Sequence, residues 1–198
     1  MTPKPIRRAA VLFLTLAAAV WASPLGAQDV FNARMLTGKA PVEPALVTVK
    51  IEVDSWTTPQ EIRELQDVLV QSGVNPFMSA FSAAKKGVVR FMYSRGWNMP
   101  IHMAQILPTD KGGHKVTLVL NRQSWDPGSY QKPGRHYFMV VELTLNAKGR
   151  GEGRFYEDAQ IQLDTMLGKI VMETYESAPK ILPQVQRAVK KDKAEGQD

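Results

Sequence analysis

The side chains best suited to proton transfer or metal binding are three histidines, His102, His114 and His136. None has another histidine two or four positions further on, and the chain contains no H-E-x-x-H segment, so the spacing typical of a zinc site is missing. The chain also has no cysteine, which removes thiol nucleophiles and iron–sulfur or zinc–thiolate sites. We therefore expect no metal and no cofactor.

A glycine-rich segment, "NAKGRGEG" at residues 146–153, places Gly149, Gly151 and Gly153 at alternate positions. A dinucleotide-binding loop needs a further glycine five positions after the first, where this chain has Arg154. The residues on both sides alternate between apolar and polar, which is typical of half-buried strands. We interpret the segment as a β-hairpin connection that binds no phosphate.

Serine chemistry has little support, since no G-x-S-x-G segment is present and Ser79 and Ser82 lie in a predicted helix. A catalytic triad can still form from residues distant in sequence. The alternative hypothesis is therefore a cofactor-free hydrolase that uses His136 or His102 with a nearby carboxylate.

Two segments combine aromatic and basic residues between predicted strands, "YSRGWNMP" at 93–100 and "RQSWDPGSYQKPGRHY" at 122–137. Connections as long as the second are uncommon in compact domains and are often functional, and aromatic plus arginine composition suits a recognition surface. The candidate ligand-binding residues are Arg95, Trp97, Trp125, Tyr130, Arg135 and His136. The structural alternative is that these aromatics fold back over a sheet edge.

The elements expected to position these loops begin with a strand at 47–53. Two helices follow: Thr58 and Glu61 form a capping box before the first, and "NPFMSAFSAAKKG" at 75–87 predicts the second. Further strands are predicted at 88–93, 101–107, 115–121, 138–145, 154–164 and 169–175. We expect an α+β fold with an N-terminal strand, two consecutive helices and a mostly antiparallel sheet. The segment that follows residue 175 is ambiguous, because Pro179 and Pro183 argue against both a regular helix and a central strand.

The N-terminus has the three parts of a secretory signal peptide: basic residues up to Arg8, an apolar run at 9–22, and small residues ending at Ala27. The apolar run is shorter than the ~20 residues that span a bilayer, so we expect no stable transmembrane segment after cleavage. Removing residues 1–27 lowers Lys+Arg from 25 to 22 against 19 Asp+Glu, and the net charge from +6 to +3. A nucleic-acid partner is therefore not expected.

The predicted organisation is a signal peptide at 1–27, a flexible lead-in at 28–44, one domain at 45–189 and a charged disordered tail at 190–198. We expect export to the periplasm or the extracellular space. The leading functional hypothesis is a non-catalytic domain that binds a ligand or an envelope protein through the aromatic-basic loops. A third hypothesis is an envelope structural protein whose sheet edge pairs with a partner strand.

The segments "VTVKIEVDSWTT", "LTLNAKGRGEG" and "IVMETYESAPKILPQV" resemble an uncharacterised family of exported bacterial proteins. The resemblance covers about residues 46–185 and includes Glu173, Tyr175 and Pro179. It implies export, but the family brings no established activity, so it assigns no functional residue.

Overall fold

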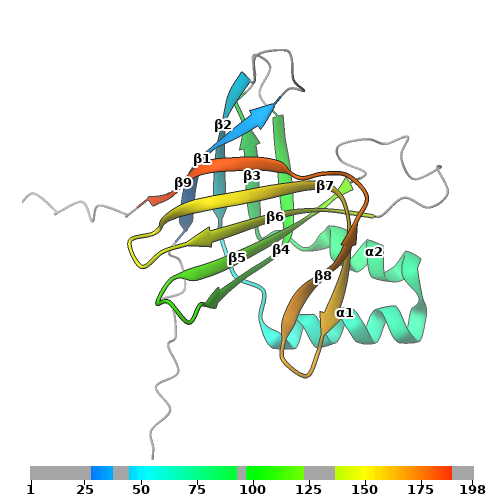
Figure 1. The fold of residues 1–198 in the computed structure, drawn as a ribbon. Helices are drawn as coiled ribbons and strands as arrows, with labels where there is room; N and C mark the ends of the chain where they lie inside the picture. Colours follow the sequence, from blue (N-terminus) through cyan, green and yellow to red (C-terminus); the bar gives the residue numbers. More distant parts are fainter. Residues whose placement is uncertain (1–27, 38–44, 93–96, 123–136, 189–198) are drawn as a thin grey trace, which may run out of the picture.

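The computed structural model of the chain describes residues 28–37, 45–92, 97–122 and 137–188. Strands dominate these ranges, and two short helices interrupt them (Figure 1). The elements are β1 (Asp29–Thr37), β2 (Ala45–Val53), α1 (Pro59–Ser72), α2 (Val74–Ala83), β3 (Gly87–Phe91), β4 (Trp97–Pro108), β5 (His114–Asn121), β6 (Phe138–Leu145), β7 (Arg150–Asp164), β8 (Lys169–Tyr175) and β9 (Lys180–Ala188).

All described strand pairs are antiparallel, and they form one sheet in the order β6-β5-β4-β3-β2-β1-β9-β7-β8. An additional pairing of β6 with β7 joins the sheet to itself. All of these strands except β8 therefore close into an eight-stranded barrel, which leaves them no unpaired edge. The predicted α+β architecture is wrong in this respect: the molecule is mostly a closed antiparallel barrel carrying two short helices.

Two strands absent from the prediction make the closure possible. β1 lies inside residues 28–44, which were expected to be a flexible lead-in, and it pairs with both β2 and β9. Its inward side chains Phe31, Ala33 and Met35 are buried. The alternation of apolar and polar residues in β1 was hard to recognise for two reasons. Ala33 adds little apolar surface to the inward set, and the apolar Leu36 occupies an outward position.

β9 also has an irregular pattern. Its buried residues Leu182 and Val185 are three positions apart, because the β7–β9 ladder shifts register opposite Gly151 and Gly153. Pro183 lies within this irregularity, where a strand tolerates the missing N–H. The proline therefore marks a bulge in a strand, and the strand completes the barrel.

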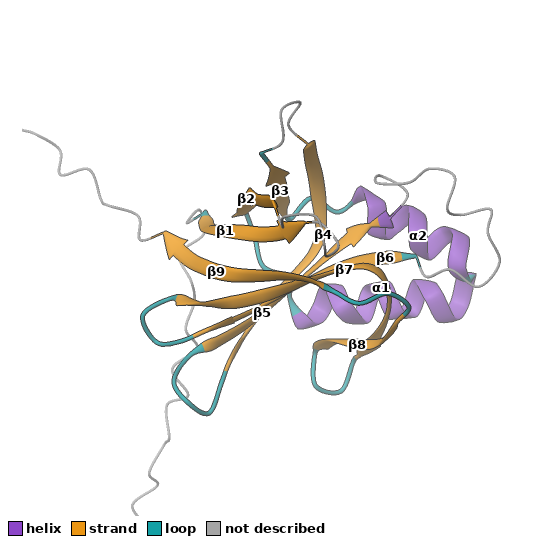
Figure 2. Ribbon diagram, turned by 45° about the horizontal axis from the view of Figure 1, so that its top comes forward, coloured by secondary structure: helices purple, strands orange, loops and turns teal. Residues whose placement is uncertain are grey.

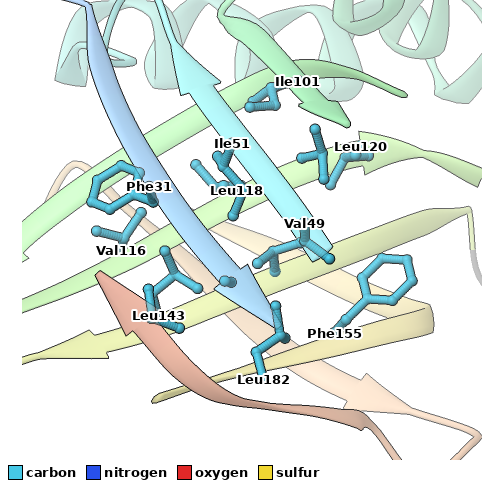
Figure 3. Close-up of a cluster of buried hydrophobic side chains, with 14 of the residues drawn as sticks. Phe31, Val49, Ile51, Ile101, Val116, Leu118, Leu120, Leu143, Phe155 and Leu182 are labelled. Atoms are coloured by element: carbon cyan, nitrogen blue, oxygen red, sulfur yellow. The ribbon is translucent and has the colours of Figure 1, made fainter. Parts of the chain in front are cut away.

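The barrel interior is a packed apolar core with side chains from all eight barrel strands, and Figure 3 shows part of it. Phe31, Ile51, Leu118 and Phe155 are among its largest fully buried members. Burial of this much apolar surface is the dominant favourable term in folding. The cavities described below lie outside this core.

The helices cover part of the outer surface of the barrel (Figure 2). The predicted capping box is confirmed: Thr58 Oγ1 accepts from the Glu61 backbone N–H at 3.2 Å, and Glu61 Oε2 accepts from the Thr58 N–H at 2.8 Å. Ile62 of α1 and Phe77 and Phe81 of α2 are buried. They form a second apolar cluster with outward side chains of β4, β5, β6 and β7 and with Ile170 of β8.

The predicted hairpin is confirmed as the pair β6–β7, although its turn is shorter than expected and spans only residues 146–149. Gly149 has φ 71°, a conformation that glycine adopts without steric cost. Gly151 and Gly153 belong to β7. A Cβ on Gly151 would lie 1.8 Å from the Thr144 carbonyl oxygen, so close backbone approach requires this glycine.

β8 continues the sheet beyond the barrel and pairs with β7 on one side. On its other side, the buried Gln105 of β4 donates from Nε2 to the Gly168 carbonyl oxygen at 2.7 Å. Gln105 Oε1 accepts from the Ile170 N–H at 3.0 Å. One side-chain amide thus satisfies two backbone groups at the start of the β8 edge.

Candidate functional site

The six predicted ligand-binding residues fall almost entirely outside the described residues. Trp97 is the first residue of β4 and pairs in register with Phe91 of β3, and its side chain is not described. The others, which lie outside the described ranges, are Arg95, Trp125, Tyr130, Arg135 and His136. Their role in binding stays a prediction.

The two ends of the longer predicted loop are described, and they lie together. The Arg122 N–H donates to the Tyr137 carbonyl oxygen at 3.1 Å. The Arg122 side chain is buried and forms an ion pair with the buried Asp158 of β7. Tyr137 is partly exposed and lines a cavity beneath the helix pair. The loop therefore starts from a buried ion pair and ends beside a cavity.

A cavity of about 310 Å³ lies between the helix pair and β4, and we call it the His102 cavity. Its apolar wall includes Leu65 and Val68 of α1, Ala80 of α2 and Met103 of β4. Its polar residues are Thr57, Glu61, Glu64, Lys86 and His102. An apolar enclosure with a few converging polar groups is the usual composition of a small-molecule site.

A β-bulge turns His102 towards this cavity. Ile101 pairs with Leu120 and Met103 pairs with Val119, so His102 is an extra residue in β4. Ile101 belongs to the barrel core, whereas Met103 belongs to the cluster beneath the helices. Bulges redirect side chains in this way and are frequent beside functional sites.

The hydrogen bonding of His102 fixes its chemistry. Its Nδ1 lies 2.8 Å from the Ala84 carbonyl oxygen, and because a carbonyl only accepts, Nδ1 carries the hydrogen. In the neutral ring Nε2 is then an acceptor, and it has no hydrogen-bond partner within the described part of the chain. Burial lowers the pKa of His102, and this outweighs the bond to Ala84. His102 therefore presents a neutral acceptor at pH 7.

The charged residues of the cavity are largely paired with each other. Lys86 Nζ lies 2.6 Å from Glu61 Oε1. Partial burial opposes ionisation of Glu61, but the hydrogen bonds from Lys86 and Thr58 prevail and lower its pKa. Glu64 accepts from the Gln60 side chain at 2.8 Å. With Glu61 and Lys86 offsetting each other, the cavity carries an excess of acceptor oxygens and one negative charge.

A second cavity of about 260 Å³ lies at the opposite ends of the same helices. Its apolar residues include Leu69, Phe77 and Ile161, and its polar ones include Glu173 and Tyr137. Phe77 stacks on Phe81 with ring centroids 6.1 Å apart, and Phe81 lies 4.9 Å from the His102 ring. Packed aromatic rings thus connect residues of the two cavities. In the described ranges no group of three or more histidine or carboxylate side chains is arranged to hold a metal.

The hydrolase hypothesis required a histidine within hydrogen-bond reach of a carboxylate and a hydroxyl. His102 bonds a backbone carbonyl instead, and among described residues it has neither of the other partners. The Thr57 hydroxyl, which lines the same cavity, accepts from the Ala104 N–H at 2.9 Å. His136 lies outside the described residues. The described part of the chain thus offers no hydrolytic arrangement around His102.

Comparisons of the chain with protein-family models, with curated proteins and with solved structures gave no match. The resemblance to exported bacterial proteins therefore stays a prediction. Neither described helix has the length and apolar composition that crossing a bilayer requires.

The sequence placed His102 in a strand predicted at 101–107 and offered it only as a possible base of a hydrolase. It missed the bulge, because the local pattern "NMPIHMAQIL" alternates without an obvious interruption. The structure reveals the change of phase, since residues 101–105 are all buried and buried residues there are adjacent instead of alternate. Residues on both faces of β4 are buried, because the inner face belongs to the barrel core and the outer face is covered by the helices and by the start of β8.

Proposed function

We propose that the protein is a non-catalytic binding protein and that its ligand is a small apolar molecule with a hydroxyl or amino group, held in the His102 cavity. The observation that carries the proposal is the unpartnered Nε2 of a histidine that is 5 % exposed and lines a cavity. Nε2 is accessible to solvent at the cavity, so a donor on a ligand would replace water as its hydrogen-bond partner.

The charges around the cavity support a ligand that donates hydrogen bonds. Glu61 and Glu64 offer further acceptors, while Lys86 is engaged by Glu61. A carboxylate ligand would meet like charges and would have to displace Glu61 from Lys86. The apolar wall of Leu65, Val68 and Met103 would contact the body of the ligand.

The test is a calorimetric titration with three probes of one length, 1-hexanol, hexylamine and hexanoate, at pH 7.5. We expect the alcohol and the amine to bind more tightly than the carboxylate. His102→Phe should weaken alcohol binding about threefold to tenfold, the worth of one hydrogen bond. His114→Phe, a histidine change outside this cavity, is the control.

A second variant keeps the test independent of the histidine. Ala80→Leu adds volume to the opposite wall and should abolish binding of all three probes, with folding checked by thermal unfolding. Equal affinity for hexanoate and hexanol, or unchanged affinity in both His102→Phe and Ala80→Leu, would overturn the proposal.

A further inference from the structure

The strands β2, β1, β9 and β7 are consecutive neighbours in the sheet (Figure 1). A polar groove of about 690 Å³ runs over the outer surface of the barrel on these strands. The strand register arranges its outward side chains in two rows. One row is Lys50, Asn32, Gln186 and Arg150, and the other is Thr48, Arg34 and Gln184. All of these except Lys50 line the groove. It lies on strands that do not carry the His102 cavity.

Two guanidinium groups in the groove are uncompensated. Within the described residues Arg34 and Arg150 have no ion-pair or hydrogen-bond partner for their side chains. Other arginines of the barrel are paired: Arg90 with Glu52, Arg122 with Asp158 and Arg187 with Asp29. Among the residues that the structure describes, no carboxylate lines the groove, so its local field favours an anion.

The remaining lining residues indicate what else the ligand carries. Asn32, Gln184 and Gln186 are exposed amides, each able to donate and to accept, and Thr48 adds a hydroxyl. This combination suits ligand hydroxyl groups, which also donate and accept. The described part of the lining contains no aromatic side chain and so offers no platform on which nucleobases stack.

We infer that this groove binds an anionic saccharide, with acid groups on Arg34 and Arg150 and ring hydroxyls on the amides between them. Arg34 on β1 and Arg150 on β7 are separated by one intervening strand, β9, and by two residues along the strand direction. These two displacements place their Cα atoms roughly 12 Å apart. That span accommodates an oligosaccharide rather than a single ion. Guanidinium groups bind carboxylate and sulfate oxygens through paired hydrogen bonds.

Glu152 is an acidic residue beside the groove, and its charge should lower the affinity of the groove for anions. It lies two residues after Arg150 and is exposed like it, on the same outward parity of β7. Its negative charge opposes an anion at Arg150 without lining the groove. Neutralising it should therefore increase affinity for an anionic saccharide.

The test is calorimetric titration of the full chain with trigalacturonate, and with maltotriose as the uncharged counterpart. We expect trigalacturonate to bind and maltotriose not to bind. Arg34→Gln and Arg150→Gln should each lower the affinity at least fivefold, Gln184→Ala should lower it less, and Glu152→Gln should raise it. Arg63→Gln, an exposed arginine on α1, is the matched control and should have no effect.

The same titrations decide against the inference if they go otherwise. Unchanged affinity in both Arg34→Gln and Arg150→Gln, with wild-type thermal midpoints, would show that the groove is not the site. Equal binding of inorganic polyphosphate or single-stranded DNA would show a general polyanion surface and overturn the assignment to saccharides. Absence of trigalacturonate binding to the wild type would overturn it directly.

Discussion

His102 donates its Nδ1 hydrogen to the carbonyl oxygen of Ala84 across 2.8 Å. The bond joins the bulge in β4 to Ala84, the C-cap residue of α2. It therefore couples the position of the helix pair to the orientation of the imidazole. The hydrogen-bonding role that we assign to His102 follows from this orientation, because it leaves Nε2 as the free acceptor.

The first prediction concerns pH. Burial lowers the pKa of His102 in the folded protein, so the unfolded chain, with an ordinary value of about 6.5, binds a proton first as the pH falls. Stability therefore falls as the pH drops from about 7 towards the folded-state pKa. Denaturant titrations at pH 7.5 and 5.5 should show a smaller loss in His102→Phe than in the wild type. Equal losses would contradict burial of a neutral imidazole.

The second prediction concerns the capping box of α1. Thr58→Ala removes the acceptor for the Glu61 N–H and should lower the free energy of unfolding by about 1 kcal/mol. Thr58→Ser retains the hydroxyl and should lie close to the wild type. A Thr58→Ser variant as destabilised as Thr58→Ala would place the effect in the lost methyl group instead of the cap.

The third prediction separates two glycines with different constraints. Gly149→Ala forces an alanine into φ 71° and should cost about 1 kcal/mol. Gly151→Ala places a Cβ 1.8 Å from the Thr144 carbonyl oxygen, so the β6–β7 ladder must shift and the loss should be larger. Thermal unfolding of the two variants gives the comparison, and a smaller loss for Gly151→Ala would contradict the close approach.

The fourth prediction concerns the β8 edge. Gln105→Met keeps the apolar volume but leaves the Gly168 carbonyl and the Ile170 N–H without their partner. Unsatisfied buried groups cost about 1–3 kcal/mol each, so the variant should be clearly destabilised. Amide hydrogen exchange at Ile170 should accelerate more than exchange at Leu118 in the barrel core. Uniform acceleration at both sites would mean that the variant loosens the whole fold.

Individual elements were predictable because their signals are local. The capping residues Thr58 and Glu61 predicted the start of α1, and the alternation of "KIVMETY" predicted β8 at residues 169–175, as observed. Turn chemistry also predicted the β6–β7 hairpin. These features depend on residues only a few positions apart, so they can be recognised in the sequence alone.

Closure of the barrel was not predictable in the same way. It depends on β9 pairing with both β1 and β7, contacts between residues such as Phe31 and Arg187 that are distant in sequence. Nothing in the alternation of either strand specifies its partner, and Pro183 obscured β9 altogether. The His102 cavity was missed for a related reason, since a bulge and a covering helix pair are properties of the assembled fold.

Binding in the His102 cavity depends on Nε2 of His102 being a free acceptor that a ligand donor can bond. The most direct measurement is the ¹⁵N chemical shift of both His102 ring nitrogens during titration with 1-hexanol at pH 7.5. We expect the free protein to show a protonated Nδ1 and an unprotonated Nε2, and the Nε2 signal alone to move towards the hydrogen-bonded value as hexanol binds. A hydrogen on Nε2 in the free protein, or an Nε2 signal that hexanol leaves unmoved, would contradict the account.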